Sequence, residues 1–219
     1  MLVYRLIWVT AIYCFILKQC SGVWTAFDLV RTKIGAWDSN GHVPYIKIHT
    51  IQDKDGIRLS NKGTLFGSAV ANIGDVNGDG IYDIGVGAIG ESTKNHRNRT
   101  ISAAAGAVYI LYMNKNGTVH SHARISGNST NGPILLSNSN FGAAICAWRP
   151  SVLAVGAPGT VFAGAVYIIT LSKNGTIEKL VLIQGKNGNG PPSKYGDSFG
   201  SSIANIGGKL NCIDTTLML

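Results

Sequence analysis

An internal repeat is the feature that most constrains the fold of this chain. The segment Gly106–Val119 returns as Gly164–Ile177, which is an offset of 58 residues (164 − 106), and nine of the fourteen aligned positions are identical. Each copy is a run of β-branched and aromatic residues that leads into Asn-Gly, a strong signal for a hairpin turn. Self-similarity at a fixed period is typical of proteins that stack one supersecondary unit on the next. The sequence therefore predicts a series of similar all-β units.

Further elements recur in a fixed order around this hairpin. The pairs Phe66-Gly67, Phe141-Gly142 and Phe199-Gly200 each open a run of small and apolar residues. The Gly-Ala pattern of residues 84–88 returns at residues 153–157. An isoleucine comes 16 to 18 residues ahead of each Phe-Gly pair, in Lys47-Ile48, Arg124-Ile125 and Leu182-Ile183. One repeat thus holds about four short strands joined by turns, which is the content of a β-propeller blade.

Oxygen-bearing side chains gather between the first Phe-Gly pair and the first Gly-Ala segment. Calcium binds six to eight oxygens from carboxylates, amides, backbone carbonyls and water, and a glycine such as Gly80 permits the sharp bend around the ion. Three carboxylates within nine residues would repel one another without a cation. The predicted ligands are the side chains of Asp75, Asn77, Asp79 and Asp83 and the backbone carbonyl of Ile81. A solvated turn without metal is the alternative, because the same residues dominate ordinary turns.

This acidic loop, residues 75–83, begins like an EF-hand and ends differently. An EF-hand needs a bidentate glutamate at its twelfth loop position and a helix on each side. The twelfth position here is Val86, in a segment where apolar residues alternate with glycine as they do in a strand. The acidic loop is therefore expected to connect two β-strands.

Taken in order, the Phe-Gly pair, the acidic loop, the Gly-Ala segment and the Gly-Ala-Val-Tyr strand resemble the FG-GAP repeat. That repeat is the blade unit of integrin alpha-chain β-propellers, and the resemblance covers roughly residues 45–207. It implies an all-β, incomplete β-propeller of antiparallel four-stranded blades. It also implies that Ca²⁺ binds in the acidic loop on one face, while partners dock chiefly on the opposite face.

The repeats depart from this pattern in ways that limit the metal prediction. The second repeat has Cys146–Ser151 where an acidic loop should lie, and the third has Gly208 at the position of Asp75. One calcium site is therefore expected. The predicted limits of the repeats are 45–122, 123–180 and a truncated 181–219.

The number of repeats is smaller than a closed propeller needs. Propellers close with four to eight blades, whereas this chain holds about two and a half. The chain is therefore expected to be a fragment or splice form, or to be completed by blades from another chain. Apolar residues of the strands around Ile84-Val86 and Val108-Ile110 are expected to remain exposed at the open ends, which favours association or aggregation.

The amino-terminal residues 1–22 have the pattern of a secretory signal peptide. Arg5 precedes an uncharged apolar run from Leu6 to Leu17, and Cys20-Ser21-Gly22 offers small residues for cleavage. The apolar run is about a dozen residues, shorter than the roughly twenty that span a bilayer. An uncleaved signal anchor is the alternative. Residues 23–44 form a lead-in segment, and the protein is expected to be secreted or on the extracellular face of the cell.

Sequons and cysteines are compatible with export. Candidate glycosylation sites of the Asn-x-Ser/Thr type are Asn98, Asn116, Asn128 and Asn174. Cys14 and Cys20 lie in the predicted leader, so Cys146 and Cys212 remain in the mature chain. These two can form one disulfide, and free buried thiols are the equal alternative.

Although the net charge is positive, no nucleic-acid partner is expected. The net charge is +8, or +6 after loss of Arg5 and Lys18 with the leader (8 − 2). The basic cluster Lys94–Arg99 is either a solvated loop or a contact for an anionic glycan or phosphate surface. It lacks the interleaved aromatic residues on which bases stack.

Catalytic patterns are weak, so a non-catalytic function is predicted. His120 and His122 would share one face of a strand, but no third metal ligand lies nearby in the sequence. No nucleophile elbow, zinc helix or phosphate-binding loop is present. The expected function is an extracellular calcium-binding module for protein or glycan recognition or cell adhesion. The alternative is an accessory propeller fragment of a secreted hydrolase or phospholipase.

Overall fold

The computed structural model describes residues 28–31, 47–50, 63–94, 100–160, 163–184 and 189–206. The predicted leader 1–22, most of the lead-in segment 23–44, the sequon at Asn98 and Cys212 lie outside these residues. The chain divides into two compact units, Met1–Gln52 and Asp53–Leu219. In the first unit, β1 (Asp28–Arg31) pairs antiparallel with β2 (Lys47–Thr50). No helix long and apolar enough to cross a membrane occurs in the described parts of the chain.

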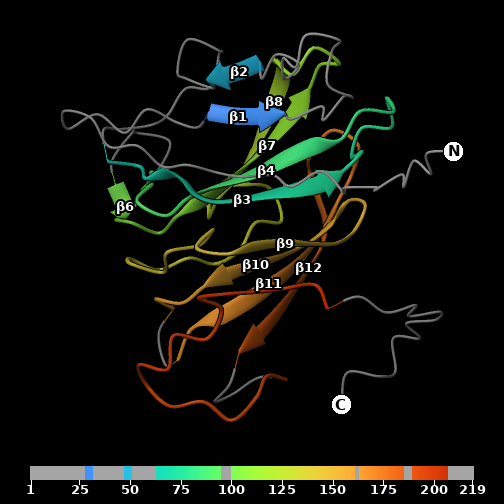
Figure 1. Ribbon diagram of the computed structural model, residues 1–219. Helices are drawn as coiled ribbons and strands as arrows, with labels where there is room; N and C mark the ends of the chain where they lie inside the picture. Colours follow the sequence, from blue (N-terminus) through green and yellow to red (C-terminus); the bar gives the residue numbers. More distant parts are fainter. Residues whose placement is uncertain are drawn as a thin grey trace, which may run out of the picture. The chain divides into compact units, whose positions relative to one another are not determined.

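The second unit is all-β and contains two four-stranded antiparallel sheets and a short hairpin (Figure 1). The first sheet has the order β3 (Phe66–Gly74), β4 (Asp83–Ala88), β7 (Ala107–Met113) and β8 (Val119–Ile125). The second has the order β9 (Ile145–Arg149), β10 (Val152–Ala157), β11 (Ala165–Leu171) and β12 (Ile177–Gln184). The hairpin consists of β5 (Thr93–Lys94) and β6 (Thr100–Ser102). The prediction of antiparallel four-stranded all-β units is confirmed.

The two sheets are built from the repeated sequence elements in the same order. The Gly-Ala-Val-Tyr segments form β7 and β11, and each makes a hairpin with the strand that comes after it. Arg124-Ile125 ends β8, and Leu182-Ile183 lies in β12. These residues therefore complete the sheet that precedes the next Phe-Gly pair, and the predicted repeat limits at 122 and 180 fall within β8 and β12.

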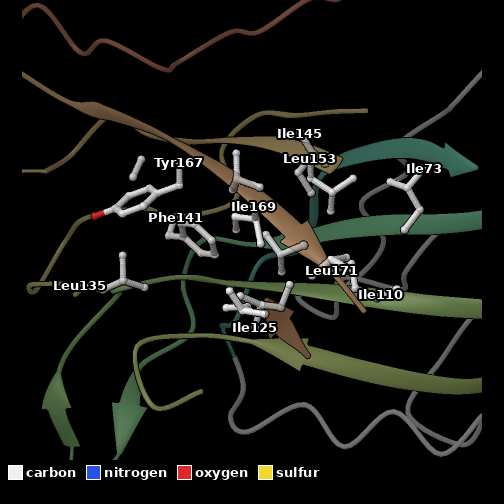
Figure 2. Packing of buried hydrophobic residues seen from close by; sticks show 14 of the residues in the cluster. Ile73, Ile110, Ile125, Leu135, Phe141, Ile145, Leu153, Tyr167, Ile169 and Leu171 are labelled. Atoms are coloured by element: carbon white, nitrogen blue, oxygen red, sulfur yellow. The ribbon is translucent and has the colours of Figure 1, made fainter. Parts of the chain in front are cut away.

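The core lies between the two sheets (Figure 2). Ile110 and Ile125 of the first sheet and Leu153 and Ile169 of the second are fully or almost fully buried in one cluster. The first strands of the two sheets, β3 and β9, pack against each other. Burying each of these aliphatic side chains contributes about 1.5–3 kcal/mol to the free energy of unfolding. Apolar packing is therefore a large part of what holds the two sheets together.

The expected exposure of the apolar strand residues is wrong for Val86, Val108 and Ile110, whereas Ile84 is half-buried. Val86 is 2% exposed, and Val108 and Ile110 are fully buried. The physical reason is their position in the sheet. Because β4 and β7 are the two central strands, β3 and β8 flank them within the first sheet. The second sheet contributes to the cluster that buries Val108 and Ile110.

Candidate functional site

The acidic loop connects β3 to β4, as the sequence predicts. Its backbone turns at Gly78 and Gly80, whose φ angles are +83° and +82°. L-amino acids with a Cβ rarely adopt this left-handed region, so glycine is required at these bends. The two glycines bring the side chains that flank them back toward the start of the loop.

The Asp75 carboxylate organises the first half of the acidic loop. Its Oδ1 accepts hydrogen bonds from the backbone N–H groups of Gly78 (2.7 Å) and Asp79 (3.1 Å), and its Oδ2 accepts one from Gly80 (2.9 Å). The hydrogen bond from Gly80 is the main cause that lowers the pKa of Asp75, and partial burial opposes it. The positive charge of Lys173 lowers this pKa further. The ionised carboxylate therefore holds the loop in its folded shape.

The side chains of Asn77 and Asp79 are hydrogen-bonded to each other. Asn77 Nδ2 donates to Asp79 Oδ2 (2.9 Å), and Asn77 Oδ1 accepts a hydrogen bond from the Asp79 backbone N–H (3.0 Å). Asp79 Oδ1 accepts a further one from the Ile81 N–H (2.7 Å). These contacts lie on the exposed side of the loop, where an ion from solvent has access.

Asp83 is fully buried and ties the acidic loop to the centre of the first sheet. Its Oδ2 accepts the N–H of Val76 (2.9 Å), and its Oδ1 accepts the N–H of Met113 in β7 (3.1 Å). Burial is the largest cause that raises the pKa of Asp83, and the negative charges of Asp79 and Asp75 raise it further. The hydrogen bonds from Val76 and Met113 lower this pKa and so oppose the effect of burial.

The ligand atoms that the acidic loop offers are of the type that calcium prefers. Asp75, Asn77, Asp79 and Asp83 supply only oxygen ligands, and a carboxylate has about four lone-pair positions, of which the loop's own hydrogen bonds use only some. Among the described residues, however, no group of three or more His, Cys, Asp or Glu side chains is placed so that it could hold a metal ion. The side chains of Asn77 and Asp79 are also bonded to each other, a contact that both would exchange for a shared ion. The calcium site stays a prediction.

Three of the predicted glycosylation sites are exposed on turns. Asn116 and Asn174 occupy equivalent positions in the β7–β8 and β11–β12 turns, and Asn128 lies just after β8. Asn128 Nδ2 donates a hydrogen bond to the Lys94 carbonyl. In the two hairpin turns the asparagine Oδ1 instead accepts hydrogen bonds from the threonine two residues later, Thr118 or Thr176.

The remaining candidate residues do not form a second site in the described chain. Cys146 is a free, half-buried thiol. His120 and His122 are both exposed on β8, and the His122 ring lies 6.1 Å from that of Tyr109. Most of the basic cluster Lys94–Arg99 lies outside the described residues.

The Phe-Gly pairs join each sheet to the next segment of the chain. Gly106 forms a β-bridge with Phe141, and Gly164 forms the same bridge with Phe199. A Cβ on Gly106 would lie 2.2 Å from the Phe141 carbonyl oxygen, and one on Gly164 would lie 2.2 Å from that of Phe199. Only glycine permits this close approach. The glycine that opens each Gly-Ala-Val-Tyr segment and the phenylalanine of the following Phe-Gly pair therefore form one repeated contact. The spacing of the motifs in the sequence does not reveal this pairing.

A buried charge network in the first sheet also escaped sequence analysis. The Glu91 carboxylate is fully buried and accepts hydrogen bonds from Tyr109 Oη (2.7 Å) and Arg124 Nε (2.6 Å). Glu91 and Thr160 are equivalent, since their carbonyls accept the N–H groups of Gly106 and Gly164. The difference between Glu91 and Thr160 is the signal that could have marked this network.

Comparison with protein-family models and with curated proteins finds no match to this sequence. The resemblance to FG-GAP repeats therefore rests on the chain's own residues. These are the Phe-Gly pairs, the acidic loop and the two equivalent hairpins, each now placed on a strand or a turn of the described sheets.

Proposed function

We propose that this chain is an extracellular, non-catalytic recognition module built from FG-GAP blades of a β-propeller, with calcium as a structural ion. The observation that carries the proposal is the repeated bridge between Gly106 and Phe141 and between Gly164 and Phe199. A contact repeated with the same geometry generates a regular array. The packing of β3 on β9 supports a radial array, because it brings the first strands of two successive sheets together.

Calcium would act as a structural staple in this module. The side chains of Asp75, Asn77, Asp79 and Asp83 and the carbonyl of Ile81 would hold it, and the ion would neutralise their mutual repulsion. Asp83 already links the loop to Met113 of β7, so ordering the loop would also secure the centre of the first sheet.

Recognition would use the end of the sheets opposite to the acidic loop. Antiparallel topology places the β3–β4, β7–β8, β9–β10 and β11–β12 turns at one end of the strands and the remaining connections at the other (Figure 1). We call the second the crossover end. Large apolar side chains exposed on its connections are Leu65, Ile101, Ile134, Leu136 and Tyr195. Ile134 is 86% exposed, whereas Tyr82, at 66%, lies in the acidic loop at the other end of the sheets. Exposed apolar side chains on neighbouring connections support a contact surface at the crossover end.

Binding of the glycosylated, secreted chain to cells or immobilised glycans tests this function. The variant Ile134→Ser with Leu136→Ser should lose most binding, because it removes apolar contacts of the crossover end. Ile206→Ser is the control, since Ile206 is equally apolar, 97% exposed and outside the crossover end. Equal loss in both variants, or in neither, would contradict the proposed contact surface.

A further inference from the structure

A turn of the second sheet is packed against the first sheet beside the acidic loop. Gly175, in the β11–β12 turn, is buried and has a φ of +76°. A Cβ on Gly175 would lie 2.5 Å from the Cβ of Ala123 and 2.7 Å from the hydroxyl of Tyr112. The β11–β12 turn therefore packs closely against β7 and β8, with no space for a side chain at residue 175.

The packing of the β11–β12 turn brings a positive charge to the acidic loop. Lys173 lies two residues before Gly175, and its Nζ is 3.4 Å from the place that a Cβ on Gly78 would take. Its charge acts on the carboxylate of Asp75, at the start of the same loop. The acidic loop of one sheet thus has a cation supplied by the next sheet.

We propose that Lys173 is a tethered counter-ion of the acidic loop and that Ca²⁺ competes with it for the negative charge of that loop. The inference rests on the proposed calcium function. In the ion-free protein the ammonium offsets part of the repulsion among the carboxylates. A bound dication repels the ammonium, so Lys173 lowers calcium affinity, and its flexible four-carbon stem allows it to move away. Calcium binding is then linked to the contact between the two sheets.

The first sheet contains a matched lysine whose charge is not among the causes that shift the pKa of Asp75 or Asp83. Lys115 stands in the β7–β8 turn in the same Lys-Asn-Gly-Thr sequence as Lys173, and both lysines are exposed. The β9–β10 turn, which replaces the acidic loop in the second sheet, consists of Pro150 and Ser151 and contains no carboxylate. The arrangement of a lysine over an acidic loop therefore belongs to one contact between repeats.

Calorimetric titration of the full secreted chain with CaCl₂ at low ionic strength tests the competition. Lys173→Gln should tighten the Kd by about two- to tenfold, the size expected for one exposed charge near the site, and Lys115→Gln should leave it unchanged. The difference should shrink in 0.5 M NaCl because salt screens exposed charges. An unchanged or weaker affinity in Lys173→Gln overturns the inference. A wild-type chain that binds no calcium overturns the proposed calcium function and, with it, the competition between Ca²⁺ and Lys173.

A second measurement in chelator separates these outcomes. A double-mutant cycle of Lys173→Gln and Asp75→Asn in EDTA reports the interaction of the two charges without any ion. The expected result is a favourable coupling that falls as salt is added. Zero coupling overturns the role of Lys173 even if calcium binds, whereas coupling in a chain that binds no calcium leaves the counter-ion role and removes only the competition.

Discussion

The guanidinium of Arg124 pairs with the carboxylate of Glu91, with Nε donating to Oε1 at 2.6 Å. Glu91 has no contact with solvent, whereas about a third of the Arg124 side chain is exposed (33%). In the second sheet the equivalent residues are Thr160 and Leu182, and the hydroxyl of Tyr167 bonds to the Ile134 carbonyl instead. The two repeats therefore fill the same place with a charged network in one case and mainly apolar contacts in the other.

Replacing Arg124 alone should strongly destabilise the first sheet. Arg124→Leu leaves the buried Glu91 carboxylate without its cation, and we expect a loss of about 2–3 kcal/mol, below the range for fully buried pairs because Arg124 is partly exposed. The double variant Glu91→Thr with Arg124→Leu copies the second sheet and should recover most of that loss. Urea denaturation measures both, and a double variant no more stable than the single one would contradict the idea of interchangeable solutions.

Two buried tyrosines of β7 should respond in opposite ways to loss of the hydroxyl. Tyr109→Phe removes the hydrogen bond to Glu91 and should cost about 1–3 kcal/mol, because a buried acceptor loses its partner. The Tyr112 hydroxyl is buried without a hydrogen-bond partner. Tyr112→Phe should therefore leave stability at pH 7 unchanged or raise it by about 1 kcal/mol. Thermal unfolding of the two variants in one buffer is the measurement.

Tyr112 should also make the protein sensitive to alkaline pH. Burial is the main cause that raises the pKa of Tyr112 to about 12 from an ordinary value of 10, and the charge of Asp83 adds to it. Because the pKa of Tyr112 is higher in the folded than in the unfolded protein, its titration leaves the free energy of unfolding unchanged below pH 10. The titration lowers that free energy as pH rises from about 10 through about 12. Denaturant unfolding at pH 9 and pH 11 should show a smaller drop for Tyr112→Phe than for wild type. Equal drops would show that Tyr112 does not titrate as its burial predicts.

The bridge between repeats should make Gly106 intolerant of any side chain. Gly106→Ala combines a φ of +90° with a Cβ 2.2 Å from the Phe141 carbonyl oxygen, so we expect a loss above about 4 kcal/mol. Gly63→Ala is the matched control, because Gly63 has the same φ and nothing within 4 Å of its Cβ position. It should lose only the backbone term of about 1–2 kcal/mol. Similar losses in the two variants would mean that the bridge adds nothing to stability.

Calcium should stabilise the first sheet through the acidic loop. Ion binding to the folded state alone raises the free energy of unfolding by about 2.7 kcal/mol when the free ion is at one hundred times its Kd. Asp79→Ala should abolish this gain. Asp197→Ala should keep it, since Asp197 lies in a separate turn, where its carboxylate accepts the Lys194 N–H. Limited proteolysis of residues 66–90 with calcium or chelator is the direct measurement, and an identical cleavage pattern would show that the loop holds no structural ion.

The sequence by itself determined the local structure of this protein. The alternation of apolar residues in 84–88 and the Asn-Gly turns at Asn116 and Asn174 predicted the strands and hairpins that the structure has. The run from Asp75 to Asp83 predicted a loop between two strands. These features arise from residues close together in the chain, where periodicity and turn chemistry act directly.

Tertiary structure alone decided which of these elements meet. It brought Glu91 to Arg124 across 33 residues, Gly106 to Phe141 and Lys173 to Gly78, and it buried Val108, which was expected to be exposed. Each of these contacts depends on how one sheet packs on another, and two residues far apart in sequence carry no local pattern that records their meeting. Side-chain volume, a missing Cβ and a buried charge select among such arrangements through the packing of one sheet on the other.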